Sequence, residues 1–332
     1  MVSNAFKEHT SEIENYLLQI ADNKTEVNID TYKKGASSTK TNINMNLQGS
    51  IIFSFDHLAA ENHTQTLIDA QHTLGGLYYL GQEVGKDLKQ AANWFKKAAE
   101  QGHVSAQHNL GVMYKNGEGI EQNFKQATEW YQKAAAQGYA EAQYNLGVLY
   151  SQNQSVEQDL KQAVNWYEKA AQQGLANAQL NLGVFYKKGQ VVEKDFKQAA
   201  NWFQKAAEQG EANAQYNLGF LYATGQSLGK DFKQAANWFQ KAAEQGQANA
   251  QYSLGIMYAD GLHAEQNFRQ AAEWYEKAAQ QGNADAQLNL GILYKEGQGV
   301  EKDLQQAANW LQKAAEQGNT KAKQSLEKLK NR

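Results

Sequence analysis

Histidine is the side chain best suited to metal binding and proton transfer near neutral pH, and the chain contains seven of them. No pair shows the H-E-x-x-H spacing that would place two metal ligands on one helix face. His57 and His63 are close in sequence, but they lie in a stretch with no clear helix or strand pattern. His72 and His108 are 36 residues apart, and we interpret them as polar contacts. The sequence therefore predicts no metal site.

Other catalytic arrangements are also missing from the sequence. The loops NGEGIEQ (116–122) and EGQGVEK (296–302) resemble phosphate-binding loops, but they follow no strand and lack the terminal Lys-Ser/Thr. The chain has no cysteine, which excludes disulfides, Cys-ligated zinc and Cys nucleophiles. The carboxylates are scattered, so no acid–base pair can be singled out. We interpret the chain as a non-enzyme without a cofactor.

Composition narrows the possible partners. The net charge of −3 gives no basic surface of the kind that nucleic-acid-binding proteins show. No segment approaches the roughly 18 apolar residues needed to span a membrane. Residues 1–20 contain acidic side chains and do not resemble a leader peptide. These features predict a cytoplasmic protein that binds neither nucleic acid nor membrane.

A repeat organises most of the chain. Tryptophan recurs every 36 residues, at Trp94, Trp130, Trp166, Trp202, Trp238, Trp274 and Trp310. A fixed period of this length is typical of stacked repeats, in which each unit buries the apolar face of its neighbour. The predicted domains are a segment 1–69, seven repeats (70–105, 106–141, 142–177, 178–213, 214–249, 250–285, 286–321) and a C-terminal helical cap at 322–332.

The pattern of each repeat predicts two helices joined by a glycine-containing loop. In the second repeat, apolar spacing predicts a first helix over 105–116, ended by Gly117 and Gly119. Asn123 and Gln126 form a capping box, in which the Asn side chain accepts from an early N–H and the Gln reaches back. The second helix is predicted over 124–136. The tryptophans are predicted to be core residues.

The segment before the repeats has a different pattern. Residues 11–21 have helical apolar spacing, and three later runs alternate as strands do. Those runs are 27–31, 43–47 and 51–55, with a loop at 33–40 and a turn at 49–50. A small antiparallel meander beside a helix is therefore expected. It could cover the exposed end of the first repeat or form a separate functional module.

The pattern A-x-x-x-L-G-x-x-Y, a Gly loop and D-x-x-x-A-x-x-W-[FY]-x-K-A-A-x-x-G resembles the Sel1-like repeat, a relative of the tetratricopeptide repeat found in bacteria. The resemblance covers 70–321 and implies an all-α, right-handed α/α solenoid whose concave face holds another protein. Relatives of this kind suggest an adaptor or an immunity protein that blocks a toxin. Enzymatic activity has been attributed to some Sel1-like proteins, so a hydrolase with an unrecognised site is the alternative from another class.

Residues that differ between repeats are the candidates for specificity. Three of the four variable positions fall on one face of the first helix in each unit, because they are spaced by four and then three residues. The fourth follows directly after them, and the lysines are expected at the rim of this face. The predicted partner-binding residues are His108, Tyr144, Leu180, Tyr216, Phe220, Tyr252, Leu288, Lys115, Lys187, Lys188 and Lys295. The alternative is that these side chains only pack between neighbouring helices. The asparagine that follows the first variable position, as in Asn109, is expected to bond neighbouring backbone.

The sequence therefore predicts a monomeric scaffold that binds a partner protein or peptide along its concave groove. A cognate toxin or effector would be that partner in an immunity protein, and a signalling, stress or host component would be the partner in an adaptor.

Overall fold

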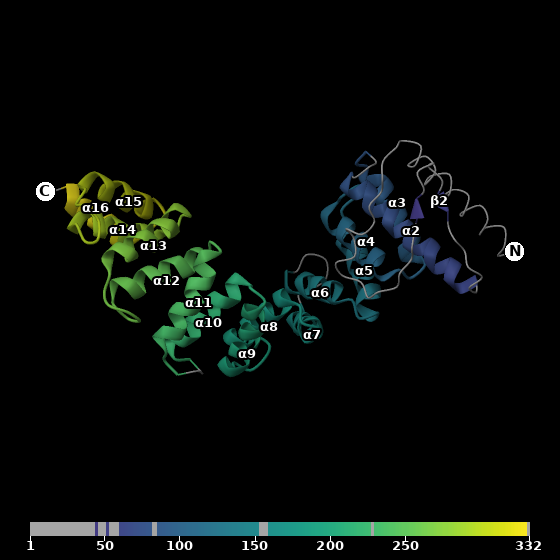
Figure 1. Ribbon diagram of the computed structural model, residues 1–332, viewed down its shortest axis with the longest axis horizontal. Coiled ribbons are helices and arrows are strands. Elements are labelled where there is room, and N and C mark those ends of the chain that lie inside the picture. Colours follow the sequence, from purple (N-terminus) through teal and green to yellow (C-terminus); the bar gives the residue numbers. More distant parts are fainter. Residues whose placement is uncertain are drawn as a thin grey trace. The chain divides into compact units, whose positions relative to one another are not determined.

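The computed structural model describes residues 44–45, 51–52, 60–81, 85–152, 159–226 and 229–330 (Figure 1). The chain divides into two compact units, residues 1–163 and 164–332, and each unit is described by itself. The division falls inside helix α7 (Leu160–Gln172).

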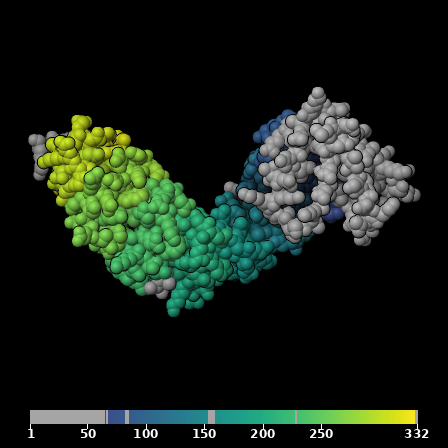
Figure 2. Space-filling model, viewed as in Figure 1, coloured from purple at the N-terminus to yellow at the C-terminus, as the bar shows by residue number. Residues whose placement is uncertain are grey.

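Antiparallel helix pairs build both units, and each of the helices named below contacts the next one in its own unit. In unit 1 these are α2 (Ala60–Leu80), α3 (Leu88–Glu100), α4 (Val104–Asn116), α5 (Phe124–Ala136) and α6 (Ala140–Gln152). In unit 2 they are α8 (Ala176–Lys188), α9 (Phe196–Glu208), α10 (Ala212–Thr224), α11 (Phe232–Glu244), α12 (Ala248–Ala259), α13 (Phe268–Gln280), α14 (Ala284–Glu296), α15 (Leu304–Glu316) and α16 (Thr320–Lys330). Within unit 2 the colours of Figure 2 follow one another in chain order, as expected when each repeat contacts its sequence neighbours.

The N-caps of the second helices agree with one part of the predicted capping box, the hydrogen bond accepted by the cap side chain. Asn123 Oδ1 accepts the N–H of Gln126 at 3.0 Å, and Asp87 caps α3 in the same way. The prediction that the glutamine reaches back to the cap N–H is wrong. The N–H of Asn123 instead donates to the carbonyl of Tyr114 at 2.8 Å, because the loop folds back on the first helix. The same bond recurs in the other repeats, for example from Asp231 to Tyr222.

Close packing of the two helices depends on a glycine. A Cβ on Gly111 would lie 2.7 Å from the ring of Tyr131, so the missing side chain lets this ring rest on α4. Tyr131 is 0% exposed, and Ala127 and Ala134 on the same face are also fully buried. The tryptophan of each following unit closes the core, as Trp238 does against Phe203 and Leu221.

One loop residue has an unusual backbone. Gly119 and Gly299 have φ values of 72° and 71°, and their Cβ-free backbone lies against the preceding second helix. Val191 occupies the same repeat position and has a φ of 73°, a left-handed conformation that β-branched residues rarely adopt. Its side chain is 43% exposed. This loop therefore stores local strain.

The segment before the repeats is described only in part. Strands β1 (Asn44–Met45) and β2 (Ile51–Ile52) pair antiparallel, within two of the three predicted runs. The helix predicted over 11–21 and the strand predicted over 27–31 lie outside the described residues. Helix α2 continues without a break from Ala60 into the first repeat.

Candidate functional site

The predicted aromatic residues of unit 2 lie half-buried on the first helices. The ring of Tyr216 is 5.7 Å from that of Phe239, and Tyr252 is 5.9 Å from Tyr275, measured between centroids. Tyr216 and Phe220 also pack against the core that α11 and α12 share. Burial raises the pKa of both Tyr216 and Tyr252. Each tyrosine therefore supports the scaffold with one part of its ring and leaves another part accessible.

The predicted lysines differ in how they are held. Lys187 Nζ donates to Asn217 Oδ1 at 2.8 Å and lies 5.0 Å from the Phe220 ring centroid. Burial, and then the charge of Lys188, lower the pKa of Lys187. Lys188 itself is exposed, whereas Lys295 forms a 2.8 Å ion pair with Glu296. Lys188 is thus the more accessible cation of this adjacent pair.

The remaining predicted residues are placed as follows. Leu180 is half-buried against the core that contains Phe203. Leu288 is 6% exposed and packs with Leu311, so it offers little area to a partner. In unit 1, His108 and Tyr144 are half-buried on α4 and α6, and Lys115 is half-buried at the end of α4.

Asparagine and histidine side chains form a chain of polar contacts across unit 1. Asn145 Nδ2 lies 3.0 Å from His108 Nε2, and His108 Nδ1 lies 3.3 Å from Asn109 Oδ1. Asn109 Nδ2 in turn lies 3.2 Å from His72 Nε2. The expected bond from Asn109 and Asn145 to neighbouring backbone is therefore wrong, because ring nitrogens of the preceding first helix take its place.

In unit 2 the corresponding asparagines have other partners. Asn217 Nδ2 donates to the Asn213 carbonyl of its own helix at 2.8 Å. Asn289 shares hydrogen bonds with the hydroxyls of Tyr252 and Tyr275. The asparagine therefore has different hydrogen-bond partners in different repeats.

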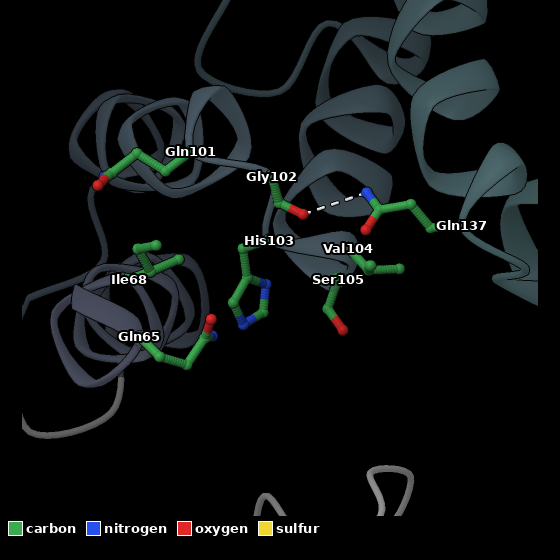
Figure 3. A pocket seen from close by; sticks show the side chains of 8 residues that line it. All are labelled: Gln65, Ile68, Gln101, Gly102, His103, Val104, Ser105 and Gln137. Carbon is green, nitrogen blue, oxygen red and sulfur yellow. Dashed lines mark hydrogen bonds between the residues drawn. The ribbon is translucent and has the colours of Figure 1, made fainter. Parts of the chain in front are cut away.

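A polar pocket lies between α2 and the start of α4 (Figure 3). It has a volume of about 340 Å³, is open to the surface and is lined by Gln65, Ile68, Gln101, Gly102, His103, Val104, Ser105 and Gln137. His103 Nδ1 accepts the N–H of Ala106 at 3.1 Å, which makes this ring the N-cap of α4. Its Nε2 lies 3.5 Å from Asp69, and its ring stacks on His72 with centroids 4.4 Å apart.

One glutamine in every repeat is buried, and its burial was not predicted from the sequence. Gln251 is 5% exposed, and its Nε2 donates to the Ala243 carbonyl at 3.1 Å. Its Oε1 accepts from Gln281 Nε2 at 2.8 Å. The same pairing ties Gln107 to Gln137 and Gln215 to Gln245. Invariance of this glutamine across the seven units was the signal that could have revealed it.

The second helices present an outer face of a different character. The lysine three residues after each tryptophan lies over the indole ring, for instance Lys133 at 3.7 Å from the centroid of Trp130. Trp94, Trp130 and Trp238 are 7–8% exposed, and the other four are half-buried. Since this arrangement is the same in all seven repeats, it carries little specificity.

The described residues contain no group of three or more His, Asp or Glu side chains that could hold a metal ion. None of the described helices combines the length and the apolar character that crossing a bilayer requires.

Comparison with known proteins fits the repeat geometry. The Sel1 repeat matches seven consecutive segments, 68–103, 104–139, 140–175, 176–211, 212–247, 248–283 and 284–319. The chain belongs to the Sel1 repeat family. Repeats of this family form scaffolds typical of protein–protein interaction. These segments begin two residues before the predicted repeat boundaries.

Solved structures support the assignment. A Sel1 repeat protein from Oxalobacter formigenes is 39% identical, with a TM-score of 0.66 over 79% of this chain and 76% of that chain. A protective antigen of uropathogenic Escherichia coli with an SLR fold is 36% identical, with a TM-score of 0.53 over 81% and 67%. An immunity protein from Pseudomonas aeruginosa is 21% identical, with a TM-score of 0.39 over 68% and 84%. No curated protein matches the chain.

Proposed function

We propose that this Sel1 repeat protein binds a partner protein through the variable face of its first helices. In unit 2 this face comprises the described side chains of α8, α10, α12 and α14 at the positions that differ between repeats. We call it the first-helix face; its main members are Tyr216, Phe220, Tyr252, Lys188 and Lys295.

The proposal rests on a difference in burial between the invariant and the variable positions of the first helices. Residues that repeat unchanged, such as Ala214, Leu218 and Gln215, are at most 4% exposed. The variable residues beside them, Tyr216 and Phe220, remain half-buried on the same helix. Since the invariant set already builds the core, the variable set is the part of the helix free to encode recognition.

The chemistry of the face suits a protein partner. Tyrosine offers a large contact area and a hydroxyl at a small cost in conformational entropy, which makes it a frequent anchor at interfaces. Tyr216 and Tyr252 are pre-positioned by their ring contacts, so little ordering is left for the binding step. Lys188 adds an exposed positive charge at one end of this series, and Asp260 adds an exposed negative charge further along.

Two biological roles fit this activity. An immunity protein would bind and block a toxin, and an adaptor would bind a signalling, stress or host component. Identification of the bound protein separates the two roles. Fractionation of the native host tests the cytoplasmic location that the sequence predicts.

The test begins with capture of the partner by the tagged protein in its native host, followed by purification of both and measurement of the dissociation constant. Lys188→Glu reverses an exposed charge on the first-helix face, and Lys197→Glu makes the same change on α9. Weaker binding by the first variant alone supports the proposal. Equal affinities for both variants, or turnover of a small substrate without any protein partner, would overturn it.

A further inference from the structure

Three histidines of unit 1 occupy one continuous contact network, and the network contains a helix cap. His103 Nδ1 accepts a backbone N–H, so this nitrogen must be unprotonated for the cap to exist. In α10, α12 and α14 of unit 2 the same cap is made by oxygen atoms, for example Asn283 Oδ1 to Ala286 N at 2.9 Å, whereas Leu175 gives α8 no side-chain cap. Only an acceptor atom that itself takes the proton near neutral pH makes the cap acid-sensitive.

The stacking partner of His103 strengthens this sensitivity. The His72 ring lies 4.4 Å from His103 at an interplanar angle of 20°, so two protonated rings would repel at contact distance. The His72 ring also packs against the ring of Phe95 on α3, with centroids 5.6 Å apart, and phenylalanine supplies no compensating charge. Burial followed by the proximity of His103 lowers the pKa of His72 to about 4.

Among the residues that the structure describes, two carboxylates act on the network. Asp69 of α2 faces His103 and partly opposes the burial that lowers the pKa of this histidine. His108 meets the rings of Tyr131 and Tyr139, and the charge of Glu141 opposes the burial that lowers its pKa. Burial is the largest cause for each of the three histidines, so the packed arrangement favours the neutral rings.

We propose that His72, His103 and His108 form an acid-sensitive latch that holds α2 and α3 against α4 and opens when the rings are protonated. Opening would uncap α4, break the contact from Asn109 to His72 and displace the first-helix residues of unit 1. The latch would thereby regulate partner binding by unit 1, a consequence that rests on the proposed function. The opening itself does not depend on a partner.

The expected size of the effect follows from proton linkage. A histidine with a pKa of 6.5 when the repeat is open and about 4 when it is closed favours opening more as the pH falls. Between pH 7.5 and pH 5.0, His72 alone would raise the opening equilibrium constant roughly 30-fold. His103 and His108 act in the same direction, so their protonation adds to this factor.

The experiment is amide hydrogen exchange on the full chain without any partner, at pH 7.5 and pH 5.0, corrected for intrinsic exchange rates. The readout is the opening constant of α2–α4 relative to that of α10–α11, whose residues 212–244 contain no histidine. We expect this ratio to rise at least 30-fold on acidification. An unchanged ratio would overturn the latch, whatever the fate of the proposed function.

A variant built from residues of the chain itself supplies the matched control. His72→Leu and His108→Leu install the side chain that Leu180 has at the same repeat position, and His103→Asn installs the cap of α14. This triple variant should lose the pH effect. If it does not fold, His103→Asn alone must reduce the effect, since it keeps the cap while removing one titrating ring. A full pH response in either folded variant would contradict the latch. Binding of the partner at both pH values then tests the regulatory consequence separately.

Discussion

Replacement of a tyrosine by phenylalanine should have opposite effects on stability at two equivalent positions of the repeat. Tyr131 and Tyr275 occupy the same position of the second helix and are 0% and 3% exposed. The Tyr131 hydroxyl has no hydrogen-bond partner among the described residues, whereas Tyr275 bonds to Asn289. The difference arises because Asn145, the counterpart of Asn289, contacts His108 instead.

The magnitude follows from the cost of a buried polar group. A buried hydroxyl without a partner costs about 1–3 kcal/mol, and a satisfied one contributes about 1 kcal/mol. Tyr131→Phe should therefore stabilise the chain by about 1 kcal/mol or more, and Tyr275→Phe should destabilise it by about 1 kcal/mol. Other repeats already carry phenylalanine here, at Phe95, Phe203 and Phe239, so the ring itself is well tolerated.

Urea denaturation followed by tryptophan fluorescence measures both variants. Because the stability of a repeat array is approximately a sum over units and interfaces, each change should shift the midpoint in proportion to its free energy. Destabilisation by both variants to the same extent would refute the reasoning, since it would mean that Tyr131 is hydrogen-bonded in solution.

Three further predictions concern strain, packing and pH. Val191→Gly should stabilise the chain by about 1 kcal/mol through relief of its left-handed backbone, whereas Val192→Gly should destabilise it in the same urea assay. Gly111→Ala should cost about 1–3 kcal/mol because its Cβ would meet a buried ring, whereas Gly85→Ala, with nothing within 4 Å, should leave the melting temperature unchanged or slightly raised. The pKa of His72 in the folded chain is about 4, below its ordinary value of 6.5. The stabilisation by its neutral ring is therefore fully present above pH 6.5 and is lost as the pH falls. Calorimetry should show a loss of about 2 kcal/mol at pH 5.

Each of these predictions has a result that contradicts it. A destabilised Val191→Gly variant would show that the valine is not strained in solution. Equal melting temperatures for Gly111→Ala and Gly85→Ala would remove the packing argument for the glycine. A His72→Leu variant that loses as much stability at pH 5 as the unaltered chain would show that this ring is not the titrating group.

The helices and their ends could be predicted from the sequence because nearby residues, such as cap residues and glycines, determine them. The second helix was predicted over 124–136 and is observed at Phe124–Ala136, between an Asn cap and a glycine with positive φ. The reach of Gln126 to the cap N–H could not be judged from sequence spacing alone. It depends on how the loop folds back to Tyr114, which is a tertiary contact.

The polar contacts between repeats were much harder to predict. A glutamine such as Gln107 normally indicates an exposed position, and only its carbonyl and amide partners in neighbouring helices make burial favourable. The cap formed by His103 could not be predicted because this position holds six different residue types along the array, including Tyr139, Leu175 and Glu211. Side-chain pairs such as Lys187 with Asn217 likewise require the distance between helices, which the period of the repeat does not contain.

The most direct test of the central claim is the affinity of the identified partner for the double variant Tyr216→Ala, Tyr252→Ala. If the first-helix face is the binding site, the dissociation constant should rise at least 10-fold, since anchors of this kind each contribute about 1–2 kcal/mol. Lys197→Glu on α9 should leave it unchanged. An unchanged affinity in a double variant that melts at a lower temperature would assign both tyrosines to the core and contradict the claim.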